Sequence, residues 1–223
     1  MRHPSPRRLV VALLLLLTAC SSGVDEVTDE PTTDPELTAS VSTVFATYRA
    51  AIEQGDAEAA ISTLDEGSLA DMARVVGLAR DADEDTIRGL PAAEQLLVLT
   101  YRLRPELLEA DDPYAALVAG RFGGQDRSLG ELGPVTAAGD DLALGVVVDG
   151  ATGTPTPLRW RFRMEEDRWR FDLVEAHRLL SEAISASARR SGVEVHELVA
   201  ATVVDLSGEQ AATVEALYTE PPR

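Results

Sequence analysis

The spacing of apolar residues changes twice along this chain of 223 residues, and each change predicts a change of secondary structure. Between residues 37 and 122 apolar residues recur about every 3.6 positions, which predicts helices. Between residues 142 and 174 they recur at every second position, which predicts strands with one buried face. The helical spacing returns after Val174. This order predicts an α+β fold with N-terminal helices, an antiparallel sheet of at least three strands and additional C-terminal helices.

Capping and helix-breaking residues predict where the first helices begin and end. Gly55 should end the first helix, Asp56 should cap a short second helix, and Ser68 can cap a third. Gly123 and Gly124 should stop the last helix before the strands. Three prolines occupy positions typical of the first turn of a helix: Pro91, Pro105 and Pro113.

Alternation of apolar and other residues predicts three strands. The second and third, at 158–164 and 169–173, are close enough to form a hairpin. A loop of four residues, Glu165 to Arg168, would set Phe162 against Phe171 and keep their faces in register. The first strand has an apolar residue at every second position: Leu142, Leu144, Val146 and Val148.

A shorter hairpin loop is less favourable on two counts. A two-residue loop at Glu165 and Glu166 needs positive φ angles, which glutamate adopts poorly. It also sets Arg161 opposite Arg170, and like charges directly opposite each other destabilise a sheet. The four-residue loop instead sets Arg161 opposite Asp172, so we expect that register.

One face of the predicted hairpin is aromatic and carries both tryptophans of the chain. Aromatic side chains line many ligand pockets, so this face can belong to a pocket. A sheet packed on a helix needs the same side chains as its core, and we favour that interpretation. The residues concerned are Trp160, Phe162, Trp169 and Phe171.

The other face of the hairpin carries five of the chain's arginines within 12 positions. Such a face can bind an anion or an acidic partner. The alternative, which we favour, is a solvated outer face neutralised by the protein's own acids, Asp172 among them. The five residues are Arg159, Arg161, Arg163, Arg168 and Arg170.

We predict no catalytic residue, no metal site and no cofactor. His177 should open a helix and His196 lies beside an apolar stripe, so both are expected at the surface or at an element boundary. The spacing of the two histidines does not match that of the ligands in a zinc site. Three aspartates at alternate positions resemble the start of a calcium loop, but Thr86 replaces its glycine and Ala92 its bidentate glutamate. Those aspartates are Asp81, Asp83 and Asp85.

The first 20 residues predict export and attachment to a membrane. Three arginines precede the apolar run of residues 9–17, and small residues follow it, which is typical of a signal peptide. The run is too short to span a bilayer, which needs roughly 20 residues. The ending Leu17-Thr18-Ala19-Cys20 resembles the lipobox of bacterial lipoproteins. The resemblance implies cleavage after residue 19 and lipidation of Cys20, the only cysteine.

The charge of the chain limits its partners. Arg2, Arg7 and Arg8 lie in the predicted signal peptide, which leaves 17 basic against 38 acidic residues and a net charge of −21. So acidic a protein is not expected to bind nucleic acid or an anionic bilayer surface. Residues 20–36 contain six acids and no base, which predicts a flexible tether between the lipid and one α+β domain at 37–223.

Two segments of that domain resemble the nuclear transport factor 2-like superfamily. The first is the predicted helix 41–54 with the break Gln54-Gly55-Asp56 after it, and the second is the late hairpin Leu158–Phe162 with Arg168–Leu173. The resemblance implies a curved sheet that wraps the first helix and forms a cone with a pocket. Enzymes of the superfamily place Asp, His or Tyr in the cone, but no such residue can be assigned here.

These observations predict a lipid-anchored, extracytoplasmic binding or scaffold module of the bacterial cell envelope, without enzymatic activity. Its partners would be the membrane, through Cys20, and a protein or a small apolar ligand. Two alternatives stay open. One is a carrier that holds a small apolar ligand in the cone, and the other is an enzyme of the isomerase or dehydratase kind. A packed cone with an exposed arginine face would favour the binding module.

Overall fold

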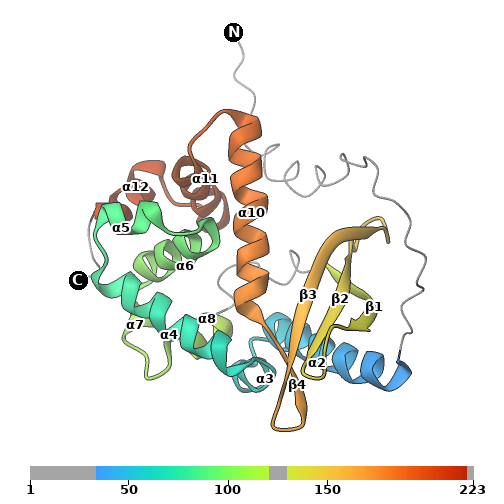
Figure 1. Cartoon of the computed structure of the whole chain (residues 1–223). Coiled ribbons are helices and arrows are strands. Elements are labelled where there is room, and N and C mark those ends of the chain that lie inside the picture. Colours follow the sequence, from blue (N-terminus) through green and yellow to red (C-terminus); the bar gives the residue numbers. More distant parts are fainter. Residues whose placement is uncertain (1–33, 121–129, 220–223) are drawn as a thin grey trace.

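A computed structural model describes residues 34–120 and 130–219 of the chain (Figure 1). Its strands are β1 (Glu131–Ala137), β2 (Leu142–Val148), β3 (Pro155–Glu165) and β4 (Arg168–Phe171). Its helices are α2 (Pro35–Gln54), α3 (Ala57–Ser62), α4 (Glu66–Asp81), α5 (Glu84–Gly89), α6 (Ala92–Leu103), α7 (Pro105–Leu108), α8 (Pro113–Ala119), α10 (Leu173–Ser191), α11 (Val195–Ser207) and α12 (Ala211–Thr219). The predicted α+β class is therefore confirmed, with helices before and after an antiparallel sheet.

Helix α10 runs between the sheet and most of the other helices, as Figure 1 shows. The described strands form one antiparallel sheet in the order β1-β2-β3-β4, which curls into a half-barrel. Helix α2 contacts both edge strands, β1 and β4, and so covers one face of the sheet. Helix α6 contacts α4, α10, α11 and α12 and lies at the centre of the helical group. The start of α10 thus links that group to the sheet.

Side-chain caps explain where the first helices begin and end. The Asp34 carboxylate accepts a hydrogen bond from the backbone N–H of Glu36, so α2 starts two residues before Leu37, the predicted start of the domain. Gly55 ends α2 with a φ of 73°, in the left-handed region that favours glycine. Asp56 then caps α3 through the N–H of Ala59, at 3.0 Å, and both of these predictions are confirmed.

The predicted cap at Ser68 is wrong. Asp65 caps α4 instead, because its carboxylate accepts a hydrogen bond from the N–H of Ser68 at 2.7 Å. The Ser68 hydroxyl in turn accepts a hydrogen bond from the N–H of Leu173 at 2.8 Å. Ser68 therefore joins the first turn of α4 to the first turn of α10, a tertiary role that capping preferences cannot predict.

Two of the three prolines start helices as predicted, Pro105 in α7 and Pro113 in α8. Pro91 occupies the N-cap position of α6, one residue before the first turn in which we expected it. The stop predicted at Gly123 and Gly124 lies outside the described residues.

The apolar face predicted for β2 is wrong, and its partner strand explains why. Ala143, Gly145 and Val147 are the buried residues of β2. Ala143 lies opposite Phe162 and Gly145 lies opposite Trp160. Opposed residues share a face, so the small residues of β2 leave room for the large rings of β3. The residues predicted to be buried lie half-buried on the other face: Leu142, Leu144, Val146 and Val148.

Phe162 lies opposite Phe171, as predicted, but the hairpin loop is shorter than predicted. Pairing continues to Glu165 opposite Arg168, which leaves a turn of two residues at 166 and 167. These two residues have φ angles of 49° and 58°, and positive φ at both positions matches the right-handed twist of the flanking strands. The hairpin therefore gains one more pair, Glu165 with Arg168, although glutamate adopts this turn conformation poorly.

Strand β1 was not predicted, because its sequence does not alternate. Gly133 and Pro134 fall in its middle, and the pairing with β2 shifts register between Leu132 and Val135. Proline cannot donate a ladder hydrogen bond and is confined to edges and bulges of sheets. Its presence here is consistent with the edge position of β1.

The side chains between α2 and the sheet pack ring against ring. The centroid of the Phe171 ring lies 5.7 Å from that of Phe45, 5.1 Å from Tyr48, 6.1 Å from Trp160 and 5.4 Å from Phe162. None of the five side chains is more than 5% exposed. Offset and edge-to-face ring pairs of this kind add stability beyond the burial of apolar area. The α2 face of the sheet is therefore the aromatic part of the core.

A buried arginine holds the helical group together. The Arg102 side chain is 3% exposed and donates hydrogen bonds to the carbonyls of Ala79, at 2.9 Å, and Ala82, at the end of α4. It also donates to the carbonyls of Leu217, at 2.8 Å, and Tyr218 in α12. The last carbonyls of a helix have no partner within the helix, so Arg102 satisfies groups that would otherwise be buried unpaired.

Candidate functional site

Strand pairing places the five predicted arginines on one face of the sheet, opposite to α2. Arg163 lies directly opposite Arg170 on β4, and both point away from the face that carries Phe162 and Phe171. Two like charges at opposed positions destabilise a sheet unless acids lie close by. The acids that pair with this face therefore decide whether its arginines are available to a partner.

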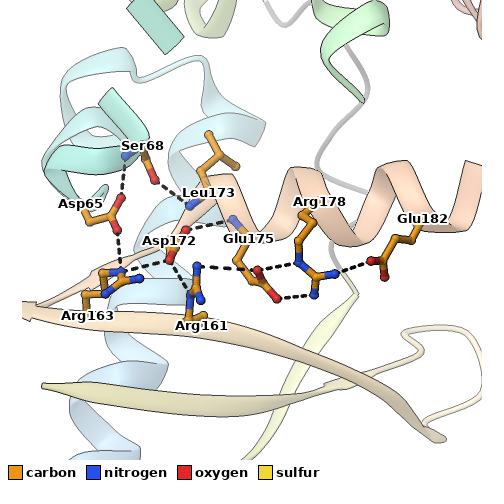
Figure 2. Close-up of polar contacts among 9 residues, drawn as sticks. All are labelled: Asp65, Ser68, Arg161, Arg163, Asp172, Leu173, Glu175, Arg178 and Glu182. Carbon is orange, nitrogen blue, oxygen red and sulfur yellow. Dashed lines mark hydrogen bonds and ion pairs between the residues drawn. The ribbon is translucent and has the colours of Figure 1, made fainter. Parts of the chain in front are cut away.

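Asp172 binds two of these arginines (Figure 2). Its Oδ2 atom lies 2.6 Å from Arg161 Nε and 3.1 Å from Arg163 Nε, and its side chain is 2% exposed. Its Oδ1 atom accepts a hydrogen bond from the N–H of Glu175 at 2.9 Å and so caps α10. Arg163 Nε also lies 3.5 Å from the carboxylate of Asp65. The two N-cap aspartates of α4 and α10 thus neutralise the centre of the arginine face.

The remaining three arginines make weaker or neutral contacts. Arg159 donates to the backbone carbonyls of Thr156 and Leu158, both at 2.9 Å. Arg168 lies 3.7 Å from the exposed carboxylate of Glu166. Arg170 donates to the carbonyl of Ser62. The face is therefore bonded largely to groups of the protein itself, by acids at its centre and by backbone carbonyls at Arg159 and Arg170.

The predicted aromatic residues occupy the core rather than this outer face. Trp160, Phe162 and Phe171 are 5% exposed or less, and Trp169 is half-buried against the same core. Met164 lies opposite Trp169 on the paired strand. The described part of the protein therefore gives these residues a packing role between α2 and the sheet.

An open groove of about 930 Å³ runs along α10. It lies on the side of the sheet that carries the arginine face, whereas α2 covers the other side. Arg161 forms part of its wall, so the groove begins at the arginine face. Pro91 and Glu94, at the start of α6, form another part of the wall. The α10 residues that line it recur every three or four positions and include Val174, Arg178, Ser181, Ser185 and Arg189.

Most charged groups of the groove are bound to one another. On α10, Arg178 Nη2 lies 2.6 Å from the carboxylate of Glu175, and its other terminal nitrogen contacts Glu182. Across the groove, Arg74 Nη2 lies 2.7 Å from Asp71 and 2.8 Å from Glu94. The hydrogen bond from Arg178 lowers the pKa of Glu175. The charges that line the groove therefore nearly balance, within a strongly acidic protein.

His177 forms part of the groove wall, and the prediction that it opens a helix at the surface or at an element boundary is wrong, because it is the buried fifth residue of α10. The side chain is 8% exposed, and its Nδ1 atom has no hydrogen-bond partner among the residues that the structure describes. Burial lowers the pKa of the imidazole to about 4, although the nearby carboxylate of Asp71 favours the charged form. The ring is therefore neutral at physiological pH and holds an unused hydrogen-bonding atom.

The sequence contains one indication that His177 is buried, namely its separation along the sequence from an apolar residue of the same helix. Ile184 lies seven positions further on and is 4% exposed, and residues seven apart share a face of a helix. His177 thus belongs to the inward stripe of α10. Its backbone carbonyl accepts a hydrogen bond from the Ser181 hydroxyl at 2.8 Å, and Ser181 Oγ accepts one from the N–H of Ala93 at 3.0 Å.

The other residues considered as ligands have structural surroundings. His196 faces the ring of Tyr218, with 6.3 Å between ring centroids. Asp83 caps α5 through Thr86, and these hydrogen bonds lower the pKa of its exposed carboxyl group. Within residues 34–120 and 130–219, no three His, Cys, Asp or Glu side chains are placed to hold a metal ion. Cys20 lies outside the described residues.

Comparison with known protein families, with curated proteins and with solved structures found no match to this chain. Of the helices described, none combines the length and the apolar character needed to cross a membrane. The resemblance to the nuclear transport factor 2-like superfamily therefore stays a prediction, as do the signal peptide, the tether and the domain boundaries.

Proposed function

We propose that this protein is a lipid-anchored binding or scaffold module of the bacterial cell envelope, without enzymatic activity. Lipidated Cys20 would hold it at the extracytoplasmic face of a membrane, and the acidic segment between Cys20 and α2 would separate the folded part from the lipid. The groove along α10 would be its binding surface. The observation that carries this proposal is the groove itself, since it is open, about 930 Å³ in volume and lined mainly by charged and hydroxyl-bearing residues.

The packing beneath the sheet supports a binding module over a carrier. A carrier of an apolar ligand needs a cavity with apolar or aromatic walls. The aromatic side chains of this protein instead pack on one another, with ring centroids 5.1–6.1 Å from Phe171. The groove along α10, by contrast, is lined mainly by charged and hydroxyl-bearing side chains.

The state of the groove's ionisable groups supports binding over catalysis. An effective general base has a pKa near the pH at which it works. His177 has a pKa of about 4 and is a weak base at neutral pH. Glu175, Glu182, Asp71 and Glu94 are engaged by Arg178 or Arg74. A wall of fixed ion pairs presents a patterned surface to a partner.

Photo-crosslinking in intact cells tests this function. A benzophenone amino acid replaces Ser185, which lines the groove, and in a control strain it replaces exposed Asp205 on α11. We expect an adduct with a component of the cell envelope from position 185 and none from position 205. The function is wrong if illumination gives no adduct at 185, or gives the same adducts at both positions.

A further inference from the structure

The groove has the length of an extended peptide. Its α10 wall extends from Val174 to Arg189, which are 15 positions apart. At a rise of about 1.5 Å per residue, this wall is about 22 Å long. An extended polypeptide rises about 3.3 Å per residue, so about seven residues would fit along it. A small metabolite would fill only part of this length.

The chemistry of the wall suits a polypeptide backbone. Its side chains alternate in charge along α10, from Glu175 through Arg178 and Glu182 to Arg189. Among the described residues that line the groove, His177 has the only aromatic ring, whereas apolar ligands and nucleobases commonly bind on aromatic walls. A polypeptide backbone carries a donor and an acceptor at almost every residue, and such a wall can bind both.

Two groups of the groove lack partners within the described protein. The Nδ1 atom of His177 has no hydrogen bond, although buried polar atoms are nearly always paired. Arg189 is exposed at the other end of the groove and forms no ion pair with a described side chain, unlike Arg161 and Arg178. A ligand that satisfied both groups would gain a hydrogen bond at one and a charge-assisted contact at the other.

We propose that the groove along α10 binds an extended segment of a partner protein, with the backbone of that segment at His177 and one of its carboxylates at Arg189. This inference rests on the proposed function and names the chemistry of its partner. The ligand carboxylate can be a side chain or a C-terminus. The Nδ1 atom of His177 is itself buried, so a hydrogen bond from the segment to it requires the side chains that cover the ring to move.

A peptide selection tests the inference. The full chain, purified in detergent, is used to select binders from a library of random nonapeptides, and their affinities are measured by fluorescence anisotropy. We expect selected peptides to share an acidic position. Arg189→Ser should weaken their binding by about tenfold or more, because a charge-assisted hydrogen bond is lost. The neighbouring Arg190→Ser, which does not line the groove, should change it by less than about twofold.

A second pair of variants tests the place of binding. Ser185→Trp fills the groove and should abolish peptide binding, whereas Ser191→Trp, at the exposed end of α10, should preserve it. Peptide addition should also shift the imidazole ¹⁵N resonances of His177 and leave those of His196 unchanged. A variant that fails to fold would also fail to bind peptide. Circular dichroism of every variant therefore distinguishes loss of the fold from loss of the binding site.

Several outcomes would overturn the inference. Failure to select any peptide, or equal binding by Ser185→Trp, excludes a peptide site in the groove. Selected peptides that are insensitive to Arg189→Ser exclude the carboxylate contact. If the mass of the partner cross-linked at position 185 is unchanged by complete proteolysis, the partner is not a polypeptide. That result would support the proposed binding function but overturn the peptide inference. Failure of the peptide site and failure of the proposed function are thereby distinguished.

Discussion

The carboxylate of Asp172 lies 2.6 Å from the guanidinium of Arg161 and joins β3 to the start of α10 (Figure 2). Asp172 is almost fully buried, and a buried charge requires a partner. The same carboxylate caps α10 through the N–H of Glu175 and also binds Arg163. One side chain thus fixes the position of α10, and with it the groove, relative to the sheet.

Asp172→Ala should therefore destabilise the protein strongly. The variant removes hydrogen bonds from two arginines to a charged group, at about 1.5–3 kcal/mol each, together with the cap of α10, at about 0.5–2 kcal/mol. Asp172→Asn keeps an oxygen for the cap and should cost less. The control is Asp56→Ala, since Asp56 only caps the exposed start of α3, at about 0.5–2 kcal/mol. Urea unfolding of the three variants measures the differences, and equal losses for Asp172→Ala and Asp56→Ala would contradict this role.

Arg161→Ala and Arg159→Ala should differ although the two residues share a face of β3. Arg161 binds the buried Asp172, and loss of a hydrogen bond to a charged group costs about 1.5–3 kcal/mol. Arg163 still neutralises Asp172 in that variant, so the loss should stay within this range. Arg159 donates to the carbonyls of Thr156 and Leu158 and forms no ion pair with a described side chain, so we expect a change of about 0–1 kcal/mol. Identical denaturation midpoints for both variants would show that the pair adds no stability.

Trp160→Ala should unfold the protein or weaken it severely. The side chain is 5% exposed and packs on Phe171, and truncation of a buried tryptophan typically costs about 3–5 kcal/mol. Thermal unfolding followed by circular dichroism measures the loss. A variant that melts like the wild type would mean that Trp160 lines an open cavity, which would restore the carrier as a candidate.

His177 should make the stability of the protein depend on pH between about 6.5 and 4. Burial lowers its pKa to about 4, below the ordinary value of 6.5. The unfolded chain therefore binds a proton in this window and the folded protein does not, so stability falls as the pH falls. Between pH 7 and pH 5 the expected loss is about 2 kcal/mol. His177→Gln should remove this loss of stability, as measured by urea unfolding at pH 7 and pH 5. If the variant still loses about 2 kcal/mol between the two pH values, His177 is not the group responsible.

Cys20→Ala should block lipidation. The variant should accumulate as uncleaved precursor or leave the membrane fraction, because the diacylglyceryl group would have no sulfur to join. Metabolic labelling with a fatty acid and fractionation of the cells give the measurement, with the unaltered chain as the control. Unchanged acyl labelling of the variant would show that Cys20 is not the attachment site.

Several parts of the fold follow from local sequence alone. Gly55 and Asp56 end one helix and begin the next because left-handed φ and side-chain capping are properties of single residues. The alternation on β3 predicted which of its side chains face inward, and the pairing of Phe162 with Phe171 followed from keeping the apolar faces together. The sequence of the helical and strand segments was sufficient to predict the α+β class.

The tertiary structure decided what depends on residues far apart in the chain. The buried face of β2 is set by Phe162 and Trp160 on its neighbour, which leave space only for Ala143 and Gly145. Ser68 bonds to Leu173, 105 positions away, and not to its own helix end as a cap. His177 is buried because α10 places its ring among the packed residues that form the groove wall. Periodicity and capping describe neighbours within one element, whereas packing between elements decides which of several possible faces is covered.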